Sequence, residues 1–103
     1  EAWNSTTIRG IAADMEFEFD PVKSDANNAK HGIDFVEAQA LWYDAAKRIL
    51  PLSFQGEVRL MCIGKIGSVL WAAIFTWRGR RIRIISVRRV RKSERLIYEQ
   101  DLG

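Results

Sequence analysis

The feature that most constrains this chain is a run near its C-terminal end in which arginine is interleaved with β-branched residues. Nine of the sixteen Lys and Arg residues lie between residues 78 and 95, and residues 81–89 read RIRIISVRR. This run is too apolar for a basic tail and too cationic for an ordinary core strand. It predicts a β-strand that holds guanidinium groups on a folded surface. Because guanidinium is always charged and its planar donor fork matches phosphate, the run indicates a polyanionic partner, above all nucleic acid.

Composition indicates one small domain with an uneven charge distribution. The chain has 103 residues, of which 48% are hydrophobic, enough for a single core. Residues 15–44 carry seven acids against two lysines, whereas residues 78–95 carry nine bases and one acid. This asymmetry predicts a cationic face. We expect residues 15–103 to form the domain, and residues 1–14 to be a disordered upstream extension or residues added for expression.

The single cysteine, Cys62, has no intramolecular disulfide partner, which favours a reducing compartment. The longest apolar run, Val69 to Phe75, has the length of a strand and is too short to cross a membrane. No Cys/His cluster has the spacing of metal ligands. These observations predict a cytoplasmic protein that needs neither a metal nor a cofactor.

The first half of the domain shows the signals of a strand followed by two helices. Residues 16–19 alternate polar and apolar, which predicts a short edge strand. Asp20 and Pro21 are typical of a helix start, and Lys30-His31-Gly32 is typical of a helix end. The expected buried stripe of this helix is Val22, Ala26 and Ala29.

A second helix is expected from residue 33 onward. Asp34 and Glu37 are three residues apart and form the acidic version of a capping box. The apolar spacing that follows predicts a buried stripe of Phe35, Ala38, Leu41, Trp42 and Ala45.

The second half of the domain is rich in predicted strands. These cover residues 48–52, 58–66, 69–76 and 81–89, and a short helix follows over residues 93–100. Pro51 assigns the first of these strands to an edge, and residues 69–76, apolar on both faces, should be the central strand. The expected fold is α+β, with two N-terminal helices packed on an antiparallel meander sheet and a short C-terminal helix.

Two sets of residues are similar to the signatures of one known family. The N-terminal set is Phe19-Asp20-x-x-Lys23, Asn27 and Lys30-His31-Gly32-x-x-Phe35-x-x-Ala38. The C-terminal set is Arg59, Ile63-Gly64 and the run over residues 81–89. Together they resemble the BrnT toxins over nearly all of residues 15–100, which makes the resemblance specific, whereas any one fragment alone would be weak.

The resemblance implies a fold similar to RelE-type ribonucleases. It implies a toxin of a type II toxin–antitoxin pair that cleaves RNA without a metal and stops translation. The implied partner is a BrnA-type antitoxin, a small ribbon-helix-helix DNA-binding protein that dimerises. The expected assembly is a hetero-oligomer of two toxins and two antitoxins that binds operator DNA only through the antitoxin. The chain departs from the family at several positions, among them Arg91, which stands where Thr usually opens the last helix. This departure predicts that the helix either starts later, at Ser93, or is docked loosely.

RNA cleavage without a metal uses the 2′-hydroxyl as nucleophile, so the enzyme must hold the phosphate and neutralise the charge of the transition state. Simple alternation places Arg81, Arg83, Ile85, Val87 and Arg89 on one face of the last strand. By the same count Arg59 and Lys65 share one face of a neighbouring strand. We predict that cations from these two strands surround one phosphodiester. The predicted catalytic cations are Arg83, Arg88, Arg89, Arg59 and Lys65.

His31 is the single histidine of the sequence, and histidine is the side chain that most often serves as a general base, so His31 is a candidate for that role. Its place just before Gly32 favours a role at the helix end over a catalytic one. Additional RNA contacts are expected near the turn before the last strand. The Trp77 indole there could stack on a base, and an exposed turn aromatic without this role fits the sequence equally well. These predicted RNA-binding residues are Trp77, Arg78, Arg80 and Arg81.

Other interpretations of the arginine strand stay open. It could be a solvated edge that charge protects from aggregation, or the docking site of an acidic antitoxin segment. The protein could also bind RNA without cleaving it. A DNA-binding module is a further alternative, and its affinity would depend on DNA sequence without any partner.

Overall fold

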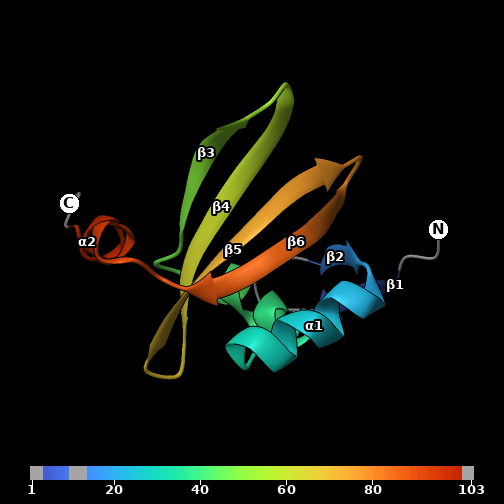
Figure 1. The fold of residues 1–103 in the computed structure, drawn as a ribbon, viewed down its shortest axis with the longest axis horizontal. Coiled ribbons are helices and arrows are strands. Elements are labelled where there is room, and N and C mark those ends of the chain that lie inside the picture. Colours follow the sequence, from blue (N-terminus) through green and yellow to red (C-terminus); the bar gives the residue numbers. More distant parts are fainter. Residues whose placement is uncertain (1–3, 10–13, 101–103) are drawn as a thin grey trace.

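One sheet organises the fold, and its strands come from both ends of the chain. The computed structural model describes residues 4–9 and 14–100. Within these residues six strands form a twisted sheet in the order β1-β2-β6-β5-β4-β3 (Figure 1). The strands are β1 Asn4–Arg9, β2 Asp14–Phe19, β3 Arg48–Phe54, β4 Glu57–Ile66, β5 Val69–Arg78 and β6 Arg81–Arg89. β2 runs parallel to β6, and the other neighbouring pairs are antiparallel.

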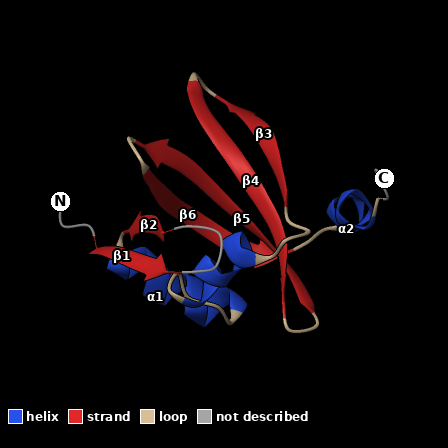
Figure 2. Ribbon diagram, turned by 180° about the vertical axis from the view of Figure 1, so that it is seen from behind, coloured by secondary structure: helices blue, strands red, loops and turns tan. Residues whose placement is uncertain are grey.

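Helical segments lie on both sides of this sheet. Helix α1 (Pro21–His31) and the 3-10 helix η1 (Glu37–Tyr43) lie on one side, and helix α2 (Lys92–Glu99) lies on the other (Figure 2). The larger core is on the α1 side, where Trp42 of η1 makes edge-to-face contacts with Phe17 and Phe75, each with ring centroids 5.2 Å apart. A smaller core on the α2 side contains Met61, Ile63 and Ala72, with Ile97 and Tyr98 packed against it. The sheet therefore has two covered faces.

The α+β class is confirmed, but the predicted arrangement of two N-terminal helices on an antiparallel meander is wrong. The sheet is mixed, because β2 pairs in parallel with β6. The chain passes through α1, η1 and strands β3 to β5 between these two strands. Only the hairpins from β3 to β6 form the expected meander.

The predicted second helix is a 3-10 helix. Its capping box forms as expected, since the Glu37 N–H donates to Asp34 Oδ1 at 2.7 Å and the Asp34 N–H donates to Glu37 Oε1 at 3.0 Å. The turns that follow have a period of three, which stacks Ala38 on Leu41 and buries both. Gly64 of β4 permits this packing, because a Cβ there would lie 3.1 Å from the Leu41 carbonyl oxygen.

Helix α1 begins and ends as predicted, but it buries a different face. The Asp20 carboxylate accepts from the Val22 N–H at 2.9 Å, and Gly32 ends the helix with a φ of 79°. The predicted apolar stripe is wrong: Val22 is 74% exposed, and Ala26 and Ala29 are exposed too. The buried residues of α1 are Ser24 and Asn27.

Asn27 explains why a polar face is buried. Its side-chain amide donates to the carbonyl oxygens of Ile33 and Val87, both at 2.9 Å, and its Oδ1 accepts from the Val87 N–H at 3.1 Å. β2 pairs with β6 only over residues 81–83, so the backbone of Val87 lies beyond the end of that pairing. The Asn27 amide therefore replaces a neighbouring strand along this part of β6 and satisfies backbone groups that would otherwise be buried without partners.

β2 is not the edge strand that its alternation suggested, because β1 pairs with it from Asn4↔Phe19 to Arg9↔Asp14. Residues 4–9, expected to be part of a disordered extension, form this strand instead. Residues 1–3 and 10–13 of the expected extension lie outside the described residues.

β3 is an edge strand, as Pro51 predicted. The Thr76 hydroxyl of β5 donates to the Val58 carbonyl at 2.9 Å, which shows that the backbone groups of Val58 point toward β5. The residues that alternate with Val58 along β4 then direct their backbone N–H and C=O groups toward β3, where they pair with Leu50 and Leu52. Pro51 lies between these two residues, so its ring nitrogen faces the open edge, where a missing N–H costs no hydrogen bond within the sheet.

We predict that Asn27→Ala lowers the free energy of unfolding by about 3 kcal/mol, since it leaves the Val87 N–H and two carbonyl groups unpaired. The control is Asn28→Ala, because Asn28 is exposed on the same helix. Urea denaturation of both variants measures the difference. Equal losses from the two substitutions would show that Asn27 does not dock α1 onto β6.

Candidate functional site

A β-bulge in β6 decides which side chains face each side of the sheet. Ile84 pairs with Phe75 and Ser86 pairs with Ile74, so Ile85 is an extra residue without a partner in β5. The extra residue shifts the alternation by one, and Ile82, Ile84 and Val87 all lie in the core on the α1 side. Arg83, Ser86 and Arg88 consequently lie on the α2 side. The alternation predicted from the sequence is therefore wrong after Ile85.

The arginines at the start of β6 face carboxylates of β2. Arg81 Nε lies 2.9 Å from Glu16 Oε2, and Arg83 Nε lies 3.7 Å from Glu18 Oε2. The parallel register, Glu16↔Arg81 and Glu18↔Arg83, lines up these pairs. The exposed Arg81 pair contributes little to stability, whereas the Arg83 pair is largely buried.

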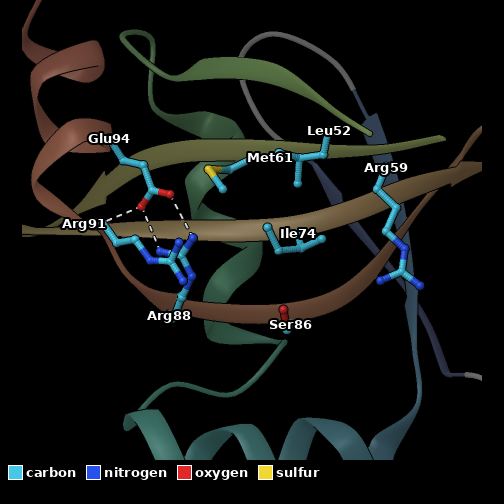
Figure 3. Close-up of a pocket in the computed structure, with 8 residues that line it drawn as sticks. All are labelled: Leu52, Arg59, Met61, Ile74, Ser86, Arg88, Arg91 and Glu94. Carbon is cyan, nitrogen blue, oxygen red and sulfur yellow. Dashed lines mark hydrogen bonds and ion pairs between the residues drawn. The ribbon is translucent and has the colours of Figure 1, made fainter. Parts of the chain in front are cut away.

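A cavity of about 460 Å³ opens on the α2 side of the sheet (Figure 3). It is lined by Leu52, Arg59, Met61, Ile74, Ser86, Arg88, Arg91 and Glu94. Figure 3 shows Arg59 at one end, Arg88, Arg91 and Glu94 at the other, and apolar side chains with Ser86 between them. Three arginines and one glutamate make the cavity cationic, so it suits an anion with an apolar portion.

The strongest polar contact in the cavity joins β6 to α2. Arg88 Nη1 donates to Glu94 Oε1 and Arg88 Nη2 donates to Glu94 Oε2, both at 2.8 Å. Glu94 is only 8% exposed and also accepts from the Arg91 N–H at 2.8 Å. Such a bidentate, charge-assisted pair fixes the plane of the guanidinium group.

The donors of Arg88 are only partly used by these contacts. A guanidinium group has five N–H donors. Nη1 donates to Glu94 and to the Arg89 carbonyl oxygen at 3.2 Å, and Nη2 donates once to Glu94. Among the described residues these contacts leave the Nε–H and the second hydrogen of Nη2, which together form a second donor fork. Arg88 can therefore bind a phosphate while Glu94 still holds it.

The hydrogen bonds from Arg88 lower the pKa of Glu94 below its ordinary value of 4.5, although burial of the carboxyl opposes this. The same hydrogen bonds raise the pKa of Arg88. The pair is therefore ionised at neutral pH.

Other predicted catalytic residues lie away from the cavity. Arg89 is exposed, and its guanidinium carbon lies 5.4 Å from the centre of the Trp71 ring. Lys65 lies near the far end of β4, with its ammonium nitrogen 5.9 Å from the centre of the Tyr98 ring. His31 is the last residue of α1, on the opposite side of the sheet, where it occupies a helix end next to Gly32. The structure thus brings Arg59 and Arg88 to one cavity and puts Arg83 on the same face.

The predicted RNA-binding residues lie around the β5–β6 turn. Arg78, Arg80, Arg81 and Trp77 are all exposed there, and Trp77 is 52% exposed with its ring 6.2 Å from that of Phe75. They form a cationic rim at the end of the sheet away from α2.

Sequence reasoning missed Arg91, Ser86 and Glu94 as parts of the site. Arg91 was interpreted only as the loss of the Thr that caps this helix in the family, and the helix was expected to start at Ser93. In the structure α2 begins at Lys92, one residue earlier. Because the Arg91 bond to Glu94 uses the backbone N–H, it does not require the Thr that the family usually has. The spacing of Arg91 and Glu94 was the available signal for this arrangement.

Within residues 4–9 and 14–100 there is no group of three or more His, Cys, Asp or Glu side chains arranged to hold a metal ion. The helices in the same part of the chain are all too short or too polar to span a membrane.

The comparison with protein families identifies this chain. The model that describes the ribonuclease toxin BrnT of type II toxin–antitoxin systems matches residues 19–94, about three quarters of the sequence. The chain belongs to the BrnT family. It is therefore a ribonuclease toxin of a type II toxin–antitoxin system, with an antitoxin as partner. The BrnT match extends from Phe19 to Glu94 and so includes Asn27, all of β6 and all eight residues that line the cavity. No curated protein matches the chain.

We predict that the Arg88–Glu94 pair makes this BrnT protein sensitive to acid. Because the pKa of Glu94 is lowered in the folded state, the pair stabilises the fold above about pH 4.5, and this contribution is lost as the pH falls through the lowered pKa. At pH 7 the variant Glu94→Gln should be less stable by about 2 kcal/mol. The two stabilities should converge as the pH falls.

Urea denaturation from pH 7 to pH 3 measures this convergence, and Glu99→Gln, at an exposed position of the same helix, is the control. Stability curves of the unchanged chain and Glu94→Gln that stay parallel down to pH 3 would show that the pair does not carry the acid response.

Proposed function

We propose that the chain is a metal-independent endoribonuclease that cleaves RNA in the cavity between β6 and α2. The observation that carries this proposal is Arg88, which Glu94 holds on the cavity wall with a second donor fork unused among the described residues. Guanidinium groups provide the positive charge that the transition state of phosphodiester cleavage requires.

The two ends of the cavity suit different parts of an RNA strand. Arg88 and Arg91 lie together at the α2 end and would bind the phosphate that is cleaved (Figure 3). Arg59 lies at the other end, where its Nη2 is 3.1 Å from Oε2 of Glu57, a carboxylate that is 53% exposed. Exposed pairs of this kind are weak, so an RNA phosphate can compete with Glu57 for Arg59. The apolar floor of Met61 and Ile74 then accommodates the nucleoside between the two phosphates.

The reaction is a transesterification. The 2′-oxygen forms a bond to the adjacent phosphorus, the bond from phosphorus to the 5′-oxygen of the next nucleotide breaks, and the proton lost by the 2′-hydroxyl is balanced by one gained at the 5′-oxygen. The products are a 2′,3′-cyclic phosphate and a 5′-hydroxyl. Arg88 and Arg91 hold the phosphate and stabilise its added negative charge.

Proton transfer is the weaker part of this site. No imidazole is among the residues that line the cavity, and His31 is on the other side of the sheet. Water would then carry the protons, and catalysis by charge stabilisation alone predicts a slow enzyme. Slow cleavage is sufficient for a toxin whose product, broken messenger RNA, stops translation.

The partner proposal follows the family resemblance. We propose that a BrnA-type ribbon-helix-helix antitoxin neutralises the toxin in a complex of two toxins and two antitoxins in the cytoplasm, and that only the antitoxin contacts operator DNA. We expect expression of this chain to arrest growth and coexpression of the antitoxin to restore it. Sequence-specific operator binding by the purified toxin alone would contradict this assignment.

We predict that Arg88→Ala lowers the rate of RNA cleavage about 100-fold, equivalent to about 3 kcal/mol of transition-state stabilisation. Arg95→Ala is the matched control, because it removes an exposed arginine of α2 that does not line the cavity. Arg89→Ala should also have a smaller effect than Arg88→Ala, because Arg89 is next in sequence but stacks on Trp71.

The measurement is cleavage of a defined RNA by the purified chain in EDTA, with the product ends analysed for 2′,3′-cyclic phosphate. Full activity of Arg88→Ala would place the chemistry elsewhere. An unchanged chain that retards RNA but never shortens it would support RNA binding without catalysis.

A further inference from the structure

The carboxylate of Glu94 occupies an unusual position for a site that binds phosphate. It is a buried anion at the end of the cavity where two arginines gather, and both of its oxygens accept from Arg88. A negative charge at this place repels a phosphate and so opposes RNA binding. Its presence therefore requires a compensating benefit.

The benefit lies in the geometry of Arg88. An arginine side chain has several rotatable bonds, and holding it in one orientation costs conformational entropy. The bidentate contact with Glu94 fixes the guanidinium plane before RNA arrives, and the bond to the Arg89 carbonyl at 3.2 Å restrains it further. The donors left over, Nε–H and one hydrogen of Nη2, then form one fixed fork.

Glu94 is itself held firmly. It is in the first turn of α2, where its Oε1 also accepts from the Arg91 N–H at 2.8 Å. It thus ties Arg88 to the start of the helix that carries Arg91 into the cavity. One carboxylate thus sets the position of the Arg88 guanidinium relative to the backbone of Arg91.

We propose that Glu94 is a positioning residue for RNA cleavage, which aims the second donor fork of Arg88 at the phosphate that is cleaved. This rests on the proposed ribonuclease function of the cavity. Glu94 does not contact the reacting atoms in this assignment. It favours the chemical step through orientation and disfavours RNA binding through its charge.

These opposite effects separate the proposal from a purely structural role. Were Glu94 only a link that docks α2, its loss would loosen the cavity and weaken RNA binding and cleavage together. α2 has other links to the rest of the chain, namely Tyr98 Oη donating to Asp44 Oδ2 at 2.7 Å and Arg48 Nη2 donating to the Gln100 carbonyl at 2.6 Å. Tyr98→Phe removes one of these links and leaves Arg88 and Glu94 intact, so it reports what loosening alone does.

The experiment compares the full chain with Glu94→Gln and Tyr98→Phe. Two quantities are measured for each: the single-turnover rate constant for cleavage of a defined RNA at saturating protein, and the affinity for the same RNA with 2′-O-methyl riboses, which cannot be cleaved. We expect Glu94→Gln to lower the rate constant 10- to 100-fold while its affinity for the analogue stays equal or rises up to fivefold. Tyr98→Phe should change the two quantities in the same direction or leave both within twofold.

A Glu94→Gln variant that cleaves as fast as the unchanged chain, or that loses rate and affinity in parallel, overturns the positioning role. An unchanged chain that cleaves no RNA overturns the proposed function itself, so the two failures are distinguishable. If Glu94→Gln does not fold, Glu94→Asp carries the test, because it keeps the negative charge and withdraws it by one methylene. A slower rate with unchanged affinity then supports the proposal, and a rate equal to that of the unchanged chain overturns it.

Discussion

The contact between Asn27 and Val87 fixes the part of β6 on which the candidate site depends. Val87 follows the bulge at Ile85 and precedes Arg88. The Asn27 amide forms hydrogen bonds with both backbone groups of Val87. The side chain of Val87 is buried in the larger core. With Val87 held inward, Arg88 must face the cavity. A helix on one side of the sheet thus determines the orientation of a catalytic candidate on the other.

The same region shows how far sequence could predict this fold and where it could not. Several predictions that depend on local chemistry are confirmed. They are the caps of α1, the box at Asp34 and Glu37, the edge position of Pro51 and the central place of β5. The bulge has no local signal, since Ile85 is as suitable for a regular strand as its neighbours. The parallel pairing of β2 and β6 joins residues far apart in sequence, which periodicity within either segment cannot reveal. The burial of Asn27 escaped prediction because its partners are backbone groups, and these carry no sequence pattern.

The cationic character of the candidate site could be predicted from the sequence better than the set of residues that form it. The run of arginines predicted a cationic surface, and in the structure Arg59 and Arg88 line one cavity. Sequence reasoning treated the arginines as independent charges, whereas the fold gives Arg81, Arg83 and Arg88 the carboxylates of Glu16, Glu18 and Glu94 as partners. The acidic first part of the chain thus neutralises one end of the arginine strand. The positive charge that remains for a ligand is concentrated near the start of α2 and around the β5–β6 turn.

The orientation of Pro51 has a consequence for how copies of this chain meet one another. β3 offers a strand edge to solvent, and such edges are where β-rich proteins join into fibres. At the middle of this edge an approaching strand finds a carbonyl oxygen but no N–H, so the hydrogen-bond ladder breaks where it would need to propagate. The proline thus protects a protein with long apolar strands from polymerising through β3.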